Sequence, residues 1–341
     1  MDVTTLGTYV TLAVTGYGEV VEGRPTWAQR EMHTYTNLVR VDPMSWAAEY
    51  GCATTAFTSA ERTAKAPLRY HDGLTEIAQL HSEDMAAHNF LDHSSWDGTS
   101  FSARVWPYYS GVTIGENVAA GYVNNAAAVW QGWMCSAGHR ANIMSASFTD
   151  IGCGVERTWY TQDFGGGAGG AQPQLAMGVH VPERPVSTVE FLATYDGDVP
   201  TWLGVETRGA CVEASLIAGS ERRGGWAAQA AVEEGCVPYR FVWVTSDAQI
   251  HALPDSGAYQ YGSGCELWIA EAPTGCDENS DLLDTGPGDS AEDCAADDRN
   301  CDGLPDRALD DTPEDCGCSG AGASGLWLGL LVALGLRRRK R

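Results

Sequence analysis

Residues 81–155 constrain the fold most, because three titratable side chains from separate short motifs in this stretch are placed to meet in one cavity. His93 ends a short turn, and Glu116 lies in the motif Gly-Glu-Asn-Val-Ala, whose glycine allows close backbone approach. His139 lies near the start of a predicted helix for which Ser136 is suited as the N-cap. Two imidazoles and one carboxylate can bind zinc and leave a fourth coordination position open.

Five short sequence blocks in this part of the chain resemble the CAP superfamily, also called the SCP domain. This superfamily includes cysteine-rich secretory proteins, antigen 5 and plant pathogenesis-related class 1 proteins, and bacterial members are the most similar. The blocks follow the family order and lie at residues 78–86, 90–93, 115–119, 133–143 and 148–154. The resemblance covers residues 25–184 and predicts a CAP domain there.

The resemblance implies an α+β fold, a three-layer α-β-α sandwich whose groove holds two histidines and two acidic residues. Carried over by motif, the two histidines are His93 and His139, and the first acidic residue is Glu116. The second acidic position, two residues before Trp133, is Gln131 here, so we expect Gln131 to line the cavity without a charge. Any role that needs a second carboxylate is weakened by this departure.

Three helices are expected in this domain, over residues 26–40, 74–88 and 124–134. His81 lies on or beside the apolar stripe of the second helix, and we interpret it as a core or supporting histidine. Two strands are expected at residues 150–162 and 174–182, joined in a hairpin by a glycine-rich connection.

The charge of the chain restricts its partners. The net charge is −24, which argues against binding to a nucleic-acid backbone. Residues 271–315 hold 16 Asp or Glu against two Arg, a net charge of −14, so more than half of the excess lies there. This stretch has no apolar periodicity and is predicted to be an acidic, disordered linker.

Eleven cysteines, none in a zinc-finger spacing, predict disulfides and an oxidising compartment. Their connectivity cannot be deduced from the sequence. Closeness along the chain alone favours the pairs Cys135–Cys153, Cys211–Cys236 and Cys294–Cys301.

The start of an exported chain should carry a signal peptide, but residues 1–24 do not form a clear one. No Lys or Arg precedes Arg24, and the first apolar run is broken by threonines. A misassigned start, a fragment or an unusual signal would each explain this, and we treat residues 1–24 as a leader of uncertain status.

Residues 185–270 show a different pattern, in which short apolar runs alternate with turn signals about every ten residues. This pattern predicts a small all-β sandwich that acts as a spacer or a binding domain.

In the acidic linker that follows, a weak calcium site is conceivable at Asp298, Asn300, Asp302 and Asp306, although Leu309 replaces the bidentate glutamate of a complete calcium loop.

Residues 316–341 form the second distinctive signal. Cys316, Gly317 and Cys318 precede a short apolar segment of about the minimum length for a transmembrane helix, and the chain ends in five basic residues. This order resembles the MYXO-CTERM sorting tail, which implies export and display at the cell surface or outer membrane. A plain C-terminal membrane anchor is the alternative.

Three functions fit these features, and we favour the first. It is an exported, surface-anchored binding module whose His/Glu cavity can hold a divalent metal such as zinc, with an extracellular lipid or protein as ligand. The second is a zinc-dependent hydrolase, but Gln131 cannot serve as its general base. The third is a structural or adhesion protein without metal, in which hydrogen bonds tie the cavity together.

Overall fold

The computed structural model describes residues 16–274 and residue 276. The chain divides into two units, residues 1–285 and 286–341, and all described residues belong to the first. The expected calcium residues and the tail with Cys316, Gly317 and Cys318 lie outside the described residues. Within the described ranges, no helix is long and apolar enough to cross a bilayer.

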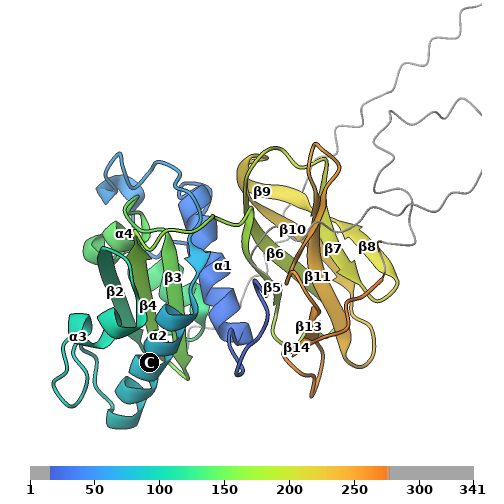
Figure 1. The fold of residues 1–341 in the computed structure, drawn as a ribbon. Coiled ribbons are helices and arrows are strands. Elements are labelled where there is room, and N and C mark those ends of the chain that lie inside the picture. Colours follow the sequence, from blue (N-terminus) through green and yellow to red (C-terminus); the bar gives the residue numbers. More distant parts are fainter. Residues whose placement is uncertain (1–15, 275, 277–341) are drawn as a thin grey trace, which may run out of the picture. The chain divides into compact units, whose positions relative to one another are not determined.

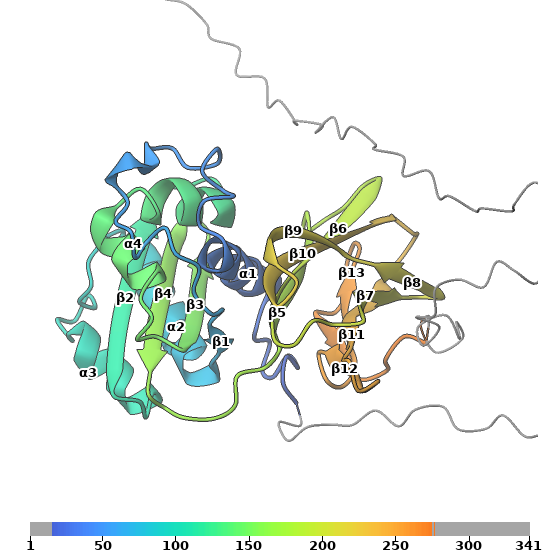
Figure 2. The same ribbon diagram turned by 90° about the horizontal axis from the view of Figure 1, so that it is seen from above.

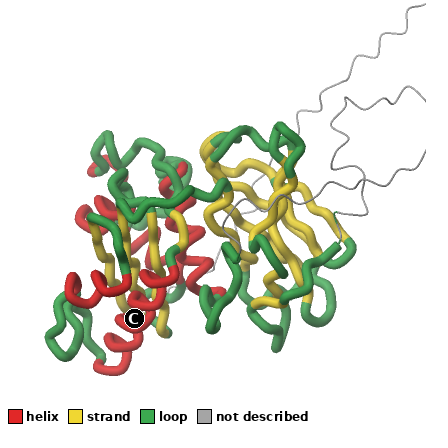
Figure 3. The backbone as a smooth tube through the Cα atoms, in the orientation of Figure 1, coloured by secondary structure: helices red, strands yellow, loops and turns green. Residues whose placement is uncertain are grey.

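The helices all lie in the first half of the described chain, as the red segments of Figure 3 show. The α-helices are α1 (Trp27–Val41), α2 (Asp72–His88), α3 (Phe101–Val105) and α4 (Ala137–Ile143). Two short 3-10 helices, η1 (Thr54–Ala56) and η2 (Trp106–Tyr108), and a π-helix, η3 (Ala127–Trp133), complete the set.

The first sheet is the middle layer of an α-β-α arrangement. It contains β1 (Arg69–Tyr70), β2 (Thr113–Ala120), β3 (Asp150–Glu156) and β4 (Trp159–Gly166), in the order β1-β3-β4-β2. β1 runs parallel to β3, and the other pairs are antiparallel. Helices α1 and α2 cover opposite faces (Figure 1). We call residues 27–166 the α-β-α region.

Neighbouring residues of β4 point to opposite faces of the first sheet. The Ser82 hydroxyl of α2 donates to Thr161 Oγ1 at 2.9 Å, whereas the next residue, Gln162, donates to Thr36 of α1 at 2.6 Å. This alternation is the side-chain period of a β-strand. Glu116 and Asp163, which pair across β2 and β4, therefore lie on the same face as Thr161, toward α2.

Two glycines of the motif Ile-Gly-Cys-Gly-Val let α2 approach the sheet closely. A Cβ atom on Gly152 would lie 2.0 Å from the Leu74 carbonyl carbon, and one on Gly154 would lie 2.1 Å from the Ala78 carbonyl oxygen. No side chain fits at either position, so these glycines determine the distance between helix and sheet.

Helix α1 is capped and almost completely buried. Thr26 and Gln29 form a reciprocal capping box, in which each backbone N–H donates to the other side chain, at 2.8 and 3.2 Å. Every residue from Gln29 to Val41 is buried. The cause is visible in Figure 2, where α1 lies between the first sheet and the strands of a second sheet. A helix covered on all sides has no solvent face.

The remaining strands form a β-rich region, as predicted, with two sheets. The strands are β5 (Leu175–Val181), β6 (Thr188–Asp196), β7 (Trp202–Thr207), β8 (Ala210–Glu213), β9 (Ser215–Ser220), β10 (Arg223–Ala231), β11 (Val237–Val244), β12 (Ile250–Leu253), β13 (Ala258–Tyr261) and β14 (Trp268–Ile269). The sheet orders are β5-β6-β10-β9 and β14-β13-β11-β7-β8, and β12 pairs with β11. Side chains of both sheets, such as Phe191 and Tyr239, form one core. We call residues 175–269 the sandwich region.

Strand pairing differs from the expectation in two places. The strand expected at residues 150–162 is a hairpin of β3 and β4, with a turn at Arg157, whose φ is +54°. The expected hairpin between this segment and residues 174–182 is wrong, because β5 pairs with β6 instead. A local apolar pattern can indicate a strand, but it does not specify the order of strands in a sheet or the strand with which each one pairs. The boundary between residues 184 and 185 stays a prediction.

Residues 16–24, which the sequence leaves as part of an uncertain leader, pack into the described fold. The Tyr17 hydroxyl donates to the Ala176 carbonyl at 2.7 Å and accepts from the Tyr70 backbone N–H at 3.3 Å. The Tyr259 hydroxyl donates to the Gly18 carbonyl at 2.7 Å. This short segment therefore contacts both the α-β-α region and the sandwich region.

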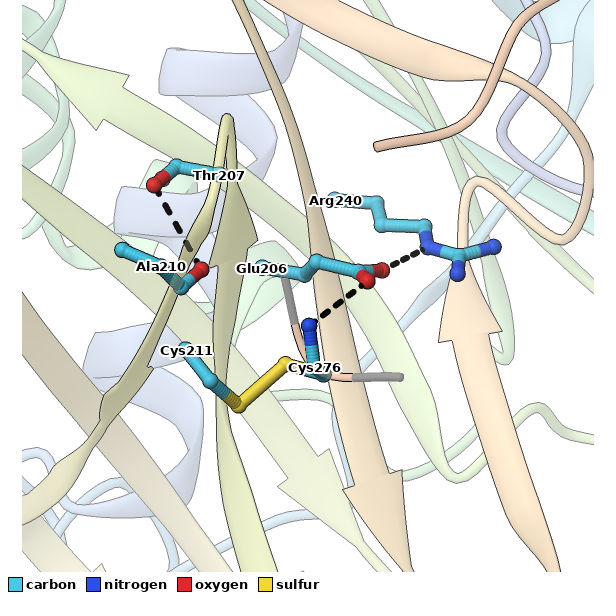
Figure 4. The surroundings of a disulfide bond; sticks show 6 residues. All are labelled: Glu206, Thr207, Ala210, Cys211, Arg240 and Cys276. Carbon is cyan, nitrogen blue, oxygen red and sulfur yellow. Dashed lines mark hydrogen bonds and ion pairs between the residues drawn. A yellow bond between two sulfur atoms is a disulfide. The ribbon is translucent and has the colours of Figure 1, made fainter. Parts of the chain in front are cut away.

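Three disulfides link the described cysteines, and none matches the pairs favoured by closeness along the chain. They are Cys52–Cys135, Cys211–Cys276 and Cys236–Cys265, whereas Cys153 is buried and unbonded. Figure 4 shows the Cys211–Cys276 bond beside the buried pair of Glu206 and Arg240. The expected pairs Cys135–Cys153 and Cys211–Cys236 are therefore wrong, because the fold brings together cysteines that are far apart in sequence. The expected pair Cys294–Cys301 lies outside the described residues.

Candidate functional site

Glu116 is the centre of a polar cluster under helix α2. It is 5% exposed, and both of its carboxylate oxygens are engaged. His93 Nδ1 donates to Oε1 at 2.7 Å, and the Arg104 guanidinium pairs with Oε2. A buried carboxylate that accepts from two such donors is held in one place by short, strong hydrogen bonds.

Arg104 positions the loop that carries His93. It lies on α3, whose first turn is capped by the Ser100 side chain. From there its Nη1 donates to the His93 carbonyl at 3.0 Å and to Ser95 Oγ at 3.2 Å. The same guanidinium thus holds the loop backbone and Glu116 together. The short helix gave no signal in the sequence, and Arg104 was not expected in the site.

His93 faces solvent on its other side. Its side chain is 56% exposed, whereas that of Glu116 is 1% exposed. The hydrogen bond to Glu116 raises the pKa of His93, against the opposing effect of partial burial. Because Nδ1 is bonded to the carboxylate, Nε2 is the ring nitrogen left to bind a ligand or metal.

His139 is brought beside this cluster by two asparagines. Asn142 of α4 donates to the Glu116 carbonyl at 3.0 Å and to Asn117 Oδ1 at 2.9 Å, and Asn117 donates to the His139 carbonyl at 3.1 Å. Burial lowers the pKa of His139, and the charge of His93 lowers it further. The backbone of His139 is thus tied to β2 next to Glu116.

Two further titratable residues lie under α2, and only one of them was noticed in the sequence. His81 is buried, as expected for a core or supporting histidine, and its Nε2 lies 4.0 Å from Glu116 Oε2 while donating to the Asp92 carbonyl at 2.9 Å. Asp163 is fully buried opposite Glu116 in the strand register. Burial raises the pKa of Asp163 well above its usual range, and the charge of Glu116 raises it further. Neither Asp163 oxygen has a hydrogen-bond partner among the described side chains.

Gln131 lies on η3 and is exposed. Its Cβ is 3.5 Å from the position that a Cβ on Gly51 would take, so it packs beside the loop that contains Gly51. Among the described residues, no hydrogen bond joins its amide to His93, Glu116 or His139. Its expected role in lining the cavity stays a prediction, and the second carboxylate near Glu116 comes from β4 instead.

Within the described ranges, no group of three or more His, Cys, Asp or Glu residues is arranged to hold a metal ion. The physical reason at this cluster is that Arg104 and His93 occupy the oxygens of Glu116. His93 and His139 remain as two imidazole donors, which fit a divalent ion that also keeps bound water. The three-ligand arrangement stays a prediction.

Comparison with known proteins connects this geometry to a family. The family described as "CAP: Cysteine-rich secretory protein family" matches residues 33–166. Over these residues the chain is similar to that family. The match contains all of the cluster residues described above, from His81 to Asp163, and it ends at the last residue of β4.

Two curated relatives from Bacillus subtilis (strain 168) match the chain. "Uncharacterized membrane protein YlbC" is 38% identical over 100 residues, which is 29% of this chain and 29% of that protein. "Uncharacterized protein YkwD" is 35% identical over 134 residues, 38% of this chain and 51% of that protein. The chain thus spans about half or less of the length of these relatives.

Solved structures with partial similarity include an extracellular protein containing a SCP domain from Bacillus anthracis str. Ames, at 34% identity and a TM-score of 0.28 over 29% of this chain and 33% of that one. An outer surface protein from Borrelia burgdorferi is 21% identical, with a TM-score of 0.27 over 29% of this chain and 77% of that one. A cysteine-rich secretory protein from Staphylococcus aureus is 19% identical, with a TM-score of 0.28 over 42% and 40%.

Proposed function

We propose that the chain is an exported binding module whose CAP domain holds a divalent metal, with zinc as the best candidate, between His93 and His139. In this proposal Glu116 is not a metal ligand but the carboxylate that orients His93. The C-terminal tail anchors the module at the cell surface or outer membrane, and its ligand is an extracellular lipid or protein.

One observation carries the metal proposal. The Nδ1–H of His93 donates to Glu116 at 2.7 Å and leaves Nε2 on the exposed side of the ring. Metal-binding histidines commonly use this arrangement, in which a carboxylate fixes the ring and raises the basicity of the other nitrogen. A bound zinc ion would offer its remaining coordination positions to oxygen or nitrogen atoms of a ligand.

Export is supported by the three disulfides of the described residues. Such bonds persist in oxidising compartments and are rare in reducing ones. Surface anchoring rests on the order of cysteine motif, apolar segment and basic end in residues 316–341.

A purely structural role is the second candidate, and a specific observation favours it. Both oxygens of Glu116 are already bonded inside the protein, and Arg104 ties them to the loop that carries His93. The cluster would then stabilise the CAP domain without binding an ion.

Zinc titration of the full chain by calorimetry separates the two roles. We expect micromolar or tighter binding that is lost in His93→Ala and in His139→Ala. Glu116→Gln should weaken binding about 10- to 100-fold without abolishing it, because it removes only the orienting group. His88→Ala is the matched control, since His88 is an exposed histidine that pairs with Asp84 on α2. If zinc does not bind to the wild-type chain, the metal proposal is wrong and the structural role remains.

A further inference from the structure

A second cavity lies on the other side of β4 from the Glu116 cluster. Its volume is about 720 Å³, within the range of about 300–1,000 Å³ that small-molecule pockets occupy. It forms where α1 faces residues 123–126, the turn between β3 and β4, and residues 181–184. Tyr160, one of its lining residues, shares the α1 side of β4 with Gln162, whereas Asp163 faces α2.

A buried carboxylate and a buried amide line this cavity together. Glu31 is 6% exposed and Asn125 is 4% exposed. Asn125 Nδ2 donates to Glu31 Oε2 at 2.7 Å and to the Ala28 carbonyl at 2.9 Å. Because the Ala28 carbonyl can only accept, the amide orientation is determined.

That orientation leaves an acceptor without a donor. Among the described residues, no group donates to Asn125 Oδ1. No cationic side chain pairs with Glu31 among the described residues either. Asn125 Oδ1 has almost no accessible surface, so Glu31, a buried carboxylate without a cationic partner, is the group that favours a ligand with N–H donors.

Aromatic rings form much of the remaining wall. Trp27 is held in place because its indole N–H donates to the His180 carbonyl at 2.8 Å, and the Tyr160 hydroxyl donates to the Tyr122 carbonyl at 2.9 Å. Tyr35 lies one helical turn from Glu31 and also lines the cavity. Aromatic faces beside a carboxylate are a recognised environment for ammonium groups.

We propose that this cavity binds a small organic ligand that carries a primary ammonium group. The ammonium donates to Glu31, and the carbon skeleton packs against Trp27, Tyr35 and Tyr160. The site is separate from the one formed by His93 and His139, so its occupancy does not depend on the metal proposal.

The protonation of Glu31 agrees with this assignment. Burial raises its pKa to about 7, although hydrogen bonds from Asn125 and Tyr35 oppose the rise and the charge of Glu183 adds to it. The other charged groups at the cavity are Arg157, which pairs with Glu156, and Arg184. An ammonium ligand favours the ionised carboxylate, so its binding near neutral pH releases a proton from Glu31.

The test is calorimetry on the full chain with phenethylamine, and with 2-phenylethanol as the uncharged probe of similar shape. At about pH 8, where Glu31 is ionised, we expect millimolar or tighter binding of the amine and at least tenfold weaker binding of the alcohol. Glu31→Gln should weaken amine binding at least tenfold. Glu83→Gln, an exposed carboxylate on α2, is the matched control and should leave it unchanged.

Two results would overturn the proposal: no binding of the amine to the wild-type chain, or equal affinity in Glu31→Gln. Thermal melting shows whether Glu31→Gln folds, and we expect it to, since glutamine still offers an oxygen to Asn125. If this variant does not fold, the proposal can still be tested on the wild-type chain alone. Titrations at about pH 7 in two buffers of different ionisation enthalpy must then reveal proton release on amine binding, and its absence contradicts the proposal.

Discussion

Glu116 in the α-β-α region and Glu206 in the sandwich region are both buried carboxylates paired with an arginine, but their surroundings differ. Glu206 accepts from Arg240 and from the Cys276 backbone N–H at 3.0 Å, and it is completely buried (Figure 4). Glu116 accepts from Arg104 and from a half-exposed histidine, and it lies opposite the unpaired Asp163. A fully paired cluster away from solvent indicates architecture, whereas a cluster with surplus titratable groups and one histidine open to solvent indicates a site.

The strongest test of this contrast is to break the pair in the sandwich region. Arg240→Met leaves Glu206 buried without its cation, and we expect the free energy of unfolding to fall by about 3–5 kcal/mol. Denaturant unfolding measures the change. The double variant Arg240→Met/Glu206→Leu should recover most of the loss, because it also removes the buried charge. A loss that persists in the double variant would mean that the pair itself stabilises the fold.

Next in size is the disulfide beside that pair. Replacing Cys211 and Cys276 by alanine should lower the free energy of unfolding by about 2–4 kcal/mol, since it releases a long loop in the unfolded chain. Cys236 and Cys265 close a loop of 29 residues inside the 65-residue loop, so with the other bond intact the two removals should differ by less than about 0.5 kcal/mol. A difference above about 1 kcal/mol would show that strain or unfolded-state structure outweighs loop length.

Asp163→Asn tests the unpaired carboxylate of the α-β-α region. The folded-state pKa of Asp163 is raised, so the wild-type chain loses stability as pH rises from about 4 toward that value. The asparagine variant does not titrate, and near pH 7 we expect it to be about 1–3 kcal/mol more stable than the wild type. The gain should shrink toward about pH 4, as followed by thermal melting across pH. A gain that is independent of pH would show that Asp163 is not held neutral by burial.

The smallest effect is expected at His93. Its folded-state pKa is raised by Glu116, so its contribution is complete below its usual pKa of about 6.5 and is lost as pH rises through the folded value. His93→Gln should therefore lower the free energy of unfolding by less than about 1 kcal/mol near pH 6 and by less still near pH 9, because the ring is more than half exposed. Denaturant unfolding at the two pH values measures both losses. The opposite trend with pH would contradict the assigned hydrogen bond.

The parts of the fold that could be predicted are those with local signals. Helix α1 was expected at 26–40 and lies at Trp27–Val41, because the capping box and apolar spacing are both in its own sequence. Helix α2 was expected at 74–88 and begins two residues earlier, with His71 as its N-cap. His93, Glu116 and His139 were expected together from their motifs. The side chains of His93 and Glu116 are joined by a hydrogen bond, and the place of the His139 imidazole beside them stays a prediction.

What could not be predicted depends on contacts between distant segments. Asp163 enters the cluster only through the register of β2 and β4, and Arg104 only through a five-residue helix. The partner of β5 and the bond between Cys211 and Cys276 likewise depend on how sheets are assembled. Local composition contains none of this information.

The Cys211–Cys276 bond also determines how the sandwich region would carry a mechanical load. Tension applied beyond Cys276 passes through the two sulfur atoms directly into β8, and the 65-residue segment between the cysteines is bypassed. Strands β9 to β14 lie inside that bypassed segment, together with the Cys236–Cys265 bond. This segment therefore cannot be extended in a stretched molecule until the bond is reduced, and it is a reserve of length that only a reductant can release.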